Sequence, residues 1–204
     1  MAADQDCAVP ACILLWLRLL GSSGKRNETQ VVDLLQSAKR ALEVREHTAR
    51  ERELVSASHL LAAGDLEQTR LAVERCLVLA PNDAMLLKFQ TDICLLGGFP
   101  QEMRDAVERS LPYMDPAKTP MFSYVLGMYA FSLEESGDTR TGIAMAKSAL
   151  EYNRRDAWAL HALSHALDGE GRVGELLELL HRTEPEWAQV CPYLYFCALE
   201  KRVN

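Results

Sequence analysis

Four glycines recur along the chain at a nearly constant spacing, and this repeat constrains the fold more than any other feature. Gly64, Gly98, Gly137 and Gly171 are separated by 34, 39 and 34 residues. Each lies between two stretches whose apolar residues recur at helical spacing, and glycine tolerates the positive φ that a tight turn after a helix requires. The spacing therefore predicts four helical hairpins, each turning at a glycine.

Short segments around these turns also match one another in register. Gly64-Asp65-Leu66-Glu67 aligns with Gly137-Asp138-Thr139-Arg140, and Asn82-Asp83-Ala84 aligns with Arg155-Asp156-Ala157. A period of about 34 residues with two helices per unit is typical of tetratricopeptide repeats. We therefore expect an all-α fold, a tetratricopeptide-type solenoid of antiparallel helical hairpins that leaves a concave wall exposed.

The repeat divides the chain into three segments. Residues 1–47 are expected to form an N-terminal helical pair, residues 48–185 four hairpins with a proline-rich linker at 112–120, and residues 186–204 an incomplete, divergent C-terminal segment. The last repeat helix is expected to end near Arg182, because Pro185 follows and proline disfavours continuation of a helix.

The composition is that of a globular protein with an acidic balance. Of the 204 residues, 49% are apolar and 25% are charged, and the formal net charge is −7. Such a chain lacks the overall positive charge that attracts a phosphate backbone, so nucleic acid is not expected as a partner.

One apolar segment, Ala11–Leu20, resembles a membrane or signal segment only superficially. It is far shorter than the roughly 20 residues that span a bilayer, and the residues before it include Asp4 and Asp6 but no Lys or Arg. The segment predicts a buried helix that ends at Gly21. It could pack internally or by dimerisation, and no membrane association is expected.

The cysteines indicate a reducing compartment. None of the six forms a Cys-x-x-Cys pair or another close metal-ligand spacing. They predict free thiols in a cytoplasmic protein. Cys76 and Cys94 lie on the apolar faces of expected helices, where cysteine behaves as a small hydrophobic residue.

Several segments, in their order and spacing, resemble the tetratricopeptide repeat protein 38 family. They are Asp83–Phe89, Gln101–Asp105, Ser123–Tyr129, and Asp156-Ala157-Trp158 followed by His161 and His165. The resemblance extends over roughly Cys12 to Gln189 and implies an α-helical repeat protein without an established enzymatic activity. Family members begin earlier and continue further, so the resemblance also implies a truncated form.

In this repeat type the first helix of each hairpin lines the groove, so counting back from each turn glycine identifies candidate binding residues. These are Lys88, Asp92, Tyr124, Phe131, Glu134, Glu135, Trp158, His161, His165 and Asp168. They predict an aromatic and acidic groove that binds a protein or peptide non-covalently. Because Lys88 is the only cation among them, the partner is expected to be basic or aromatic rather than acid-terminated.

A metal-dependent activity is the main alternative. His161 and His165 are four residues apart on one helix face and could ligate one ion with Asp168. No His-Glu-x-x-His pattern or distant further ligand accompanies them, and Glu134–Glu135 is more simply a solvated helix end. No Gly-x-Ser-x-Gly elbow or glycine-rich phosphate loop occurs, so the sequence predicts a non-enzymatic scaffold without a cofactor or metal.

A second alternative is a truncated isoform without independent function. Four leucines of the last repeat helix have no convincing successor helix to cover them: Leu176, Leu177, Leu179 and Leu180. An uncovered apolar face favours self-association. The small-molecule, metal and truncated-isoform alternatives all remain open at the level of sequence.

Overall fold

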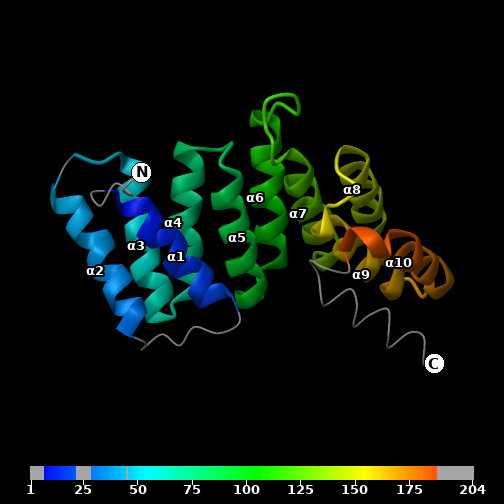
Figure 1. Cartoon of the computed structure of the whole chain (residues 1–204), viewed down its shortest axis with the longest axis horizontal. Helices are drawn as coiled ribbons and strands as arrows, with labels where there is room; N and C mark the ends of the chain where they lie inside the picture. Colours follow the sequence, from blue (N-terminus) through cyan, green and yellow to red (C-terminus); the bar gives the residue numbers. More distant parts are fainter. Residues whose placement is uncertain (1–6, 22–28, 45, 188–204) are drawn as a thin grey trace. The chain divides into compact units, whose positions relative to one another are not determined.

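The computed structural model describes residues 7–21, 29–44 and 46–187, and all regular structure within them is helical (Figure 1). The all-α prediction is therefore confirmed. The helices are α1 (Ala8–Leu20), α2 (Thr29–Val44), α3 (Ala49–Ala63), α4 (Leu66–Leu79), α5 (Ala84–Gly97), α6 (Pro100–Ser110), the 3-10 helix η1 (Leu111–Tyr113), α7 (Phe122–Glu135), α8 (Thr139–Tyr152), α9 (Ala157–Gly169) and α10 (Val173–Trp187). The chain divides into two compact units, residues 1–106 and 107–204.

The four turn glycines share one backbone geometry. Their φ angles are +85°, +72°, +92° and +68° in chain order, and no other described residue has a positive φ. At each turn the residue after the glycine donates its N–H to the carbonyl five residues earlier, at 2.8 to 3.1 Å, in the pairs Asp65 to Leu60, Phe99 to Cys94, Asp138 to Leu133 and Arg172 to Leu167. This bond satisfies a carbonyl at the helix end that has no partner within the helix.

Aspartates cap two helices that follow a turn glycine, α4 and α8, and two helices that begin a hairpin, α5 and α9. Asp65, Asp83, Asp138 and Asp156 each accept a hydrogen bond from a backbone N–H two or three residues later. A side-chain acceptor at this position satisfies one of the N–H groups that a helix start leaves unpaired. The segments that align in the sequence therefore have the same physical role, as helix caps.

In unit 1 (residues 1–106), α1 packs against α2, α3 and α5. Its Trp16 is fully buried; the indole Nε1 donates to Ser58 Oγ on α3 at 2.7 Å, and the ring lies 4.5 Å from Phe89 on α5. One face of α1 is therefore packed internally and the helix ends at Gly21 as predicted, whereas Leu14 and Leu17 are 57% and 61% exposed, so the prediction of a buried helix holds for that one face.

In unit 2 (residues 107–204), glycines permit close approach of α7 to α8 and α9. A Cβ on Gly142 would lie 2.9 Å from the carbonyl oxygen of Ala130, and a Cβ on Gly127 would lie 3.1 Å from the backbone nitrogen of Ala159. Both neighbours are backbone atoms, which cannot move aside without shifting a helix. The α7–α8–α9 assembly therefore requires these two glycines for close packing.

The C-terminal helix differs from the sequence prediction in two ways. α10 continues through Pro185 to Trp187 instead of ending near Arg182. Trp187 is 2% exposed and donates from Nε1 to Thr183 Oγ1 at 3.1 Å, so burial of the ring offsets the cost of the proline.

The leucines of α10 also depart from expectation. Leu176, Leu179 and Leu180 are buried, and Leu177 is partly buried, so the predicted bare apolar face is not present. Most of the expected divergent C-terminal segment, residues 188–204, lies outside the described residues. Among the helices that the structure describes, none is both long and apolar enough to span a membrane.

Cys76 and Cys94 are expected to react slowly with iodoacetamide at pH 8 in the folded protein. Burial raises the pKa of the Cys76 thiol to about 11 and that of the Cys94 thiol to about 12, and the thiolate is the reactive species. Peptide-level mass spectrometry measures the rates, with the half-buried Cys7 as internal comparison. Denaturation in urea should restore the labelling of both; equal labelling of Cys94 and Cys7 in the folded chain would contradict this packing.

Gly171→Ala is expected to lower the free energy of unfolding by about 1–2 kcal/mol, because the substitution forces an L side chain into the left-handed region. Nothing lies within 4 Å of a Cβ at this position, so the effect is conformational rather than steric. Gly169→Ala, in the helix just before the same turn and equally unobstructed, is the control and should cause no loss. Urea denaturation measures the free energy of unfolding of both variants. Equal values would contradict the assignment of Gly171 to a left-handed turn.

Candidate binding surface on helices α7 and α9

One face of α9 carries three rings in succession, which we call the ring row: Trp158, His161 and His165. Their spacing of three and four residues places them one above another on a helix. The Trp158 and His161 rings stack with centroids 5.4 Å apart and an interplanar angle of 4°, and the His161 and His165 rings stack at 4.5 Å. All three residues are partly exposed, and the stacking covers part of each ring face.

Phe131 on α7 lies beneath the ring row. Its ring centroid is 5.3 Å from Trp158, 5.6 Å from His161 and 5.8 Å from His165, and the residue is only 3% exposed. The expectation that Phe131 is a groove anchor is therefore wrong. Its ring packs between two hairpins and supports the row from below.

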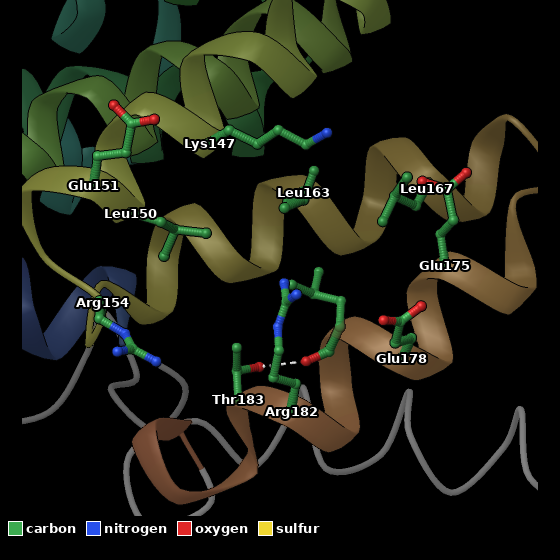
Figure 2. Close-up of a pocket in the computed structure, with 11 residues that line it drawn as sticks. Lys147, Leu150, Glu151, Arg154, Leu163, Leu167, Glu175, Glu178, Arg182 and Thr183 are labelled. Carbon is green, nitrogen blue, oxygen red and sulfur yellow. Dashed lines mark hydrogen bonds between the residues drawn. The ribbon is translucent and has the colours of Figure 1, made fainter.

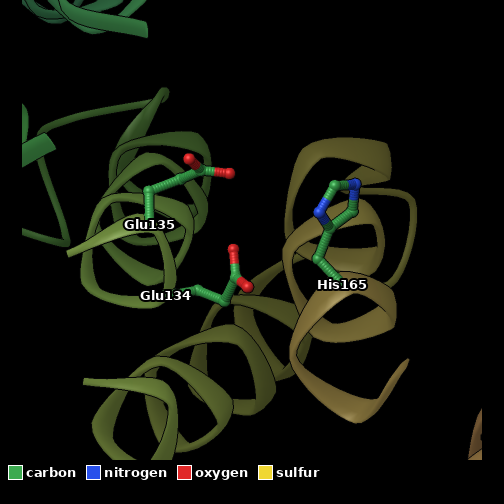
Figure 3. A group of neighbouring side chains, drawn as sticks. All are labelled: Glu134, Glu135 and His165. Carbon is green, nitrogen blue, oxygen red and sulfur yellow. The ribbon is translucent and has the colours of Figure 1, made fainter. Parts of the chain in front are cut away.

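Two glutamates at the end of α7 lie beside His165 (Figure 3). Glu134, Glu135 and His165 each offer one ligand atom such that all three atoms lie within 4.8 Å of one another. Glu135 is exposed, whereas Glu134 is partly buried and its Oε2 atom has no hydrogen-bond partner in the structure. The interpretation of the pair as a solvated helix end thus holds for Glu135 and is wrong for Glu134.

Burial shifts the pKa values of two side chains in this corner, Glu134 and His161. Burial raises the pKa of Glu134, and the neighbouring Glu135 carboxylate adds to the increase while His165 opposes it. Burial also lowers the pKa of His161 to about 4, with a further contribution from His165. At neutral pH His161 is therefore an uncharged ring in the stack.

The remaining predicted site residues belong to both units. Lys88 and Asp92, on α5 of unit 1, form an ion pair with each other, one helical turn apart. Lys88 therefore presents a paired charge rather than the separate groove cation that the sequence suggested. Tyr124 is partly buried on α7, and Asp168 is exposed at the end of α9 outside the Glu134–Glu135–His165 group.

Unit 1 shows what can cover the position six residues before the turn glycine of a hairpin. Ser58 stands six residues before its turn glycine, as do Phe131 and His165 in unit 2. Ser58 is fully buried because Trp16 of α1 lies on it. In unit 1 a short apolar helix thus covers this position of a first helix, whereas in unit 2 His165 is partly exposed.

A cavity of about 830 Å³ lies between α8, α9 and α10 (Figure 2). Leu163 and Leu167 of α9 line it; they stand two residues after His161 and His165, roughly 200° around the helix and hence on its opposite face. Lys147, Glu151, Arg154, Glu175, Glu178 and Arg182 line it with charges of both signs. Counting back from the turn glycines did not predict this concavity. That count identifies residues on the first helices of the hairpins, whereas most of the lining residues lie on the second helices α8 and α10.

No protein-family model matches the chain, but solved structures share its arrangement of helices. The kinesin light chain TPR-like repeats of Podosopora anserina match with a TM-score of 0.60 at 11% identity over 93% of this chain and 99% of theirs. The MamA RS-1 ArsTM double mutant matches with a TM-score of 0.57 at 12% identity over 94% and 99%.

A third structure is YrrB, described as a TPR protein with an unusual peptide-binding site, with a TM-score of 0.52 at 18% identity over 80% of this chain and 85% of YrrB. The chain has a tetratricopeptide-type fold. At these identities the likeness concerns the fold alone, and it confirms the architecture that the 34-residue period predicts.

The His161 imidazole of this tetratricopeptide-type chain is expected to titrate near pH 4. Its folded pKa lies below the value of about 6.5 for an unfolded chain, so the unfolded state takes up the proton first and stability falls as the pH drops from about 6.5 towards 4. NMR titration of the imidazole signals measures the pKa directly. The His161→Gln variant should lack the imidazole signal that titrates near pH 4. The His181→Gln variant, changed at an exposed histidine, should keep that signal. A His161 pKa above 6 would contradict the burial of its ring in the stack.

Proposed function

We propose that the chain is a non-enzymatic interaction module and that the ring row on α9, together with Tyr124 on α7, binds a peptide or helical segment of a partner protein. The surface is aromatic and partly exposed, and the repeat fold places it on the first helices of the third and fourth hairpins. Aromatic residues at a partly exposed surface are the residue type that most often dominates binding energy in protein interfaces.

The observation that carries this proposal is the position of α1 in unit 1. A helix that presents Trp16 covers Ser58, which stands at the same distance from its turn glycine as His165. The first helices of this chain thus accept an apolar helical segment when one is supplied within the chain. In unit 2 we infer that a segment from another protein performs the same role.

Charge suggests which segments bind. Glu134 and Glu135 flank the ring row and Asp168 ends α9, and none of the predicted groove residues on α7 or α9 is a lysine or arginine. An acid-terminated peptide would be repelled, whereas a basic or aromatic segment would be attracted. The description of YrrB as peptide-binding is consistent with this class of partner.

The sequence resemblance to the tetratricopeptide repeat protein 38 family and the cytoplasmic location remain part of this proposal. The free, buried thiols Cys12, Cys76 and Cys94 support the cytoplasmic location, since free cysteines persist in reducing compartments.

A Trp158→Ala, Tyr124→Ala double variant is expected to weaken peptide binding at least tenfold, because loss of one interface hot spot costs about 2 kcal/mol and each 1.4 kcal/mol is a factor of ten. Peptides are first selected with the wild-type chain from a displayed random library that includes helical scaffolds. Their dissociation constants are then measured by fluorescence polarisation in metal-free buffer.

Tyr113→Ala is the control, because Tyr113 is an aromatic residue that is 64% exposed and lies on η1, outside α7 and α9. It should bind the selected peptides as the wild type does. Enrichment of acid-terminated peptides, or equal affinities of the double variant and the wild type, would refute the proposed surface.

A further inference from the structure

Two carboxylates and one imidazole converge where α7 ends. Glu134 and Glu135 are the last two residues of α7, and Figure 3 shows their carboxylates and the ring of His165 on α9 directed towards one another. Their ligand atoms lie within 4.8 Å of one another, the only such group of three or more potential ligands among the described residues. With metal–ligand bonds of about 2.1 Å, ligand atoms around a tetrahedral ion stand about 3.4 Å apart, so the three groups need to draw closer together than the 4.8 Å limit to hold an ion.

Without an ion this arrangement is unfavourable. Glu134 Oε2 is shielded from solvent and accepts no hydrogen bond in the structure, and a second carboxylate follows it in the sequence. A buried acceptor without a donor destabilises the folded state, and more so when it is charged. A cation held between the three groups would supply the missing partner and cancel the repulsion between the carboxylates.

We propose that Glu134, Glu135 and His165 bind one zinc ion, with water in the fourth position. The donor set of one imidazole nitrogen and two carboxylate oxygens suits Zn²⁺, which accepts nitrogen and oxygen ligands and is often held by three protein groups and a water. Mg²⁺ and Ca²⁺ prefer sites made entirely of oxygen, and Ca²⁺ requires six or more ligands. The site goes beyond the proposed peptide binding, which does not require an ion.

Zinc binding is tested on the tag-free full chain after removal of metals with a chelator. Isothermal titration calorimetry should show one zinc ion per chain, with affinity at least about tenfold weaker in His165→Ala and in Glu134→Gln, since each removes a ligand. His181→Ala and Glu184→Gln, exposed residues of the same types on α10, are the matched controls and should retain the wild-type affinity. Equal affinity of all five proteins, or no stoichiometric zinc, would overturn the proposal.

Two further readouts separate ligands from merely structural residues. Without metal, Glu134→Gln should melt at the same temperature as the wild type or higher, because it removes the repulsion between two neighbouring carboxylates; with zinc, only the wild type should gain stability. A lower melting temperature of the metal-free variant together with unchanged zinc affinity would assign Glu134 a structural role and refute the site.

Cobalt(II) reports on the ligand type in the unaltered chain. The proposed nitrogen and oxygen ligands predict a spectrum without the intense thiolate-to-cobalt bands that cysteine coordination produces. Strong thiolate bands, or binding of Mg²⁺ as tight as that of Zn²⁺, would contradict the assignment. Peptide binding is measured without metal, so a failure to bind zinc would leave the peptide-binding proposal intact. A failure to bind peptides would likewise leave the zinc proposal intact.

Discussion

The hydrogen bond that closes each hairpin is the interaction on which the rest of the structure depends. At four turns the residue after a left-handed glycine donates to the carbonyl five residues earlier. This bond fixes the direction in which the second helix leaves, and an aspartate then caps that helix at two of the turns. Because the same local geometry is used four times, first and second helices alternate along the chain, as a repeat fold requires.

The first helices of the two units then differ in what covers them. In unit 1, α1 lies against α3 and α5 and buries Trp16. In unit 2 the ring row on α9 stays partly exposed above the buried Phe131. One repeat geometry thus produces a first-helix position that is buried within unit 1, at Ser58, and one that is partly exposed within unit 2, at His165.

Local sequence signals predicted the hairpins, the turn glycines and the helix that ends at Gly21, because each depends on residues close in the sequence. Three features depend on side chains that meet across helices or on tertiary burial: the burial of Phe131, the approach of Glu134 to His165, and the continuation of α10 through Pro185. Helical periodicity fixes a face but not the register between two helices. The pairing of Lys88 with Asp92 is within one helix, and the i, i+4 spacing could have revealed it.

The central claim is that the ring row of unit 2 is partly exposed and binds a partner segment, whereas α1 covers the Ser58 position of unit 1. Fluorine NMR of the chain labelled with fluorotryptophan tests it, because the three tryptophans report separately: Trp16 and Trp187 are 0% and 2% exposed, and Trp158 is partly exposed. The account predicts that only the Trp158 signal shifts on transfer from H₂O to D₂O and on addition of a selected peptide. A Trp16 signal that responds as strongly, or a Trp158 signal that does not respond, would contradict it.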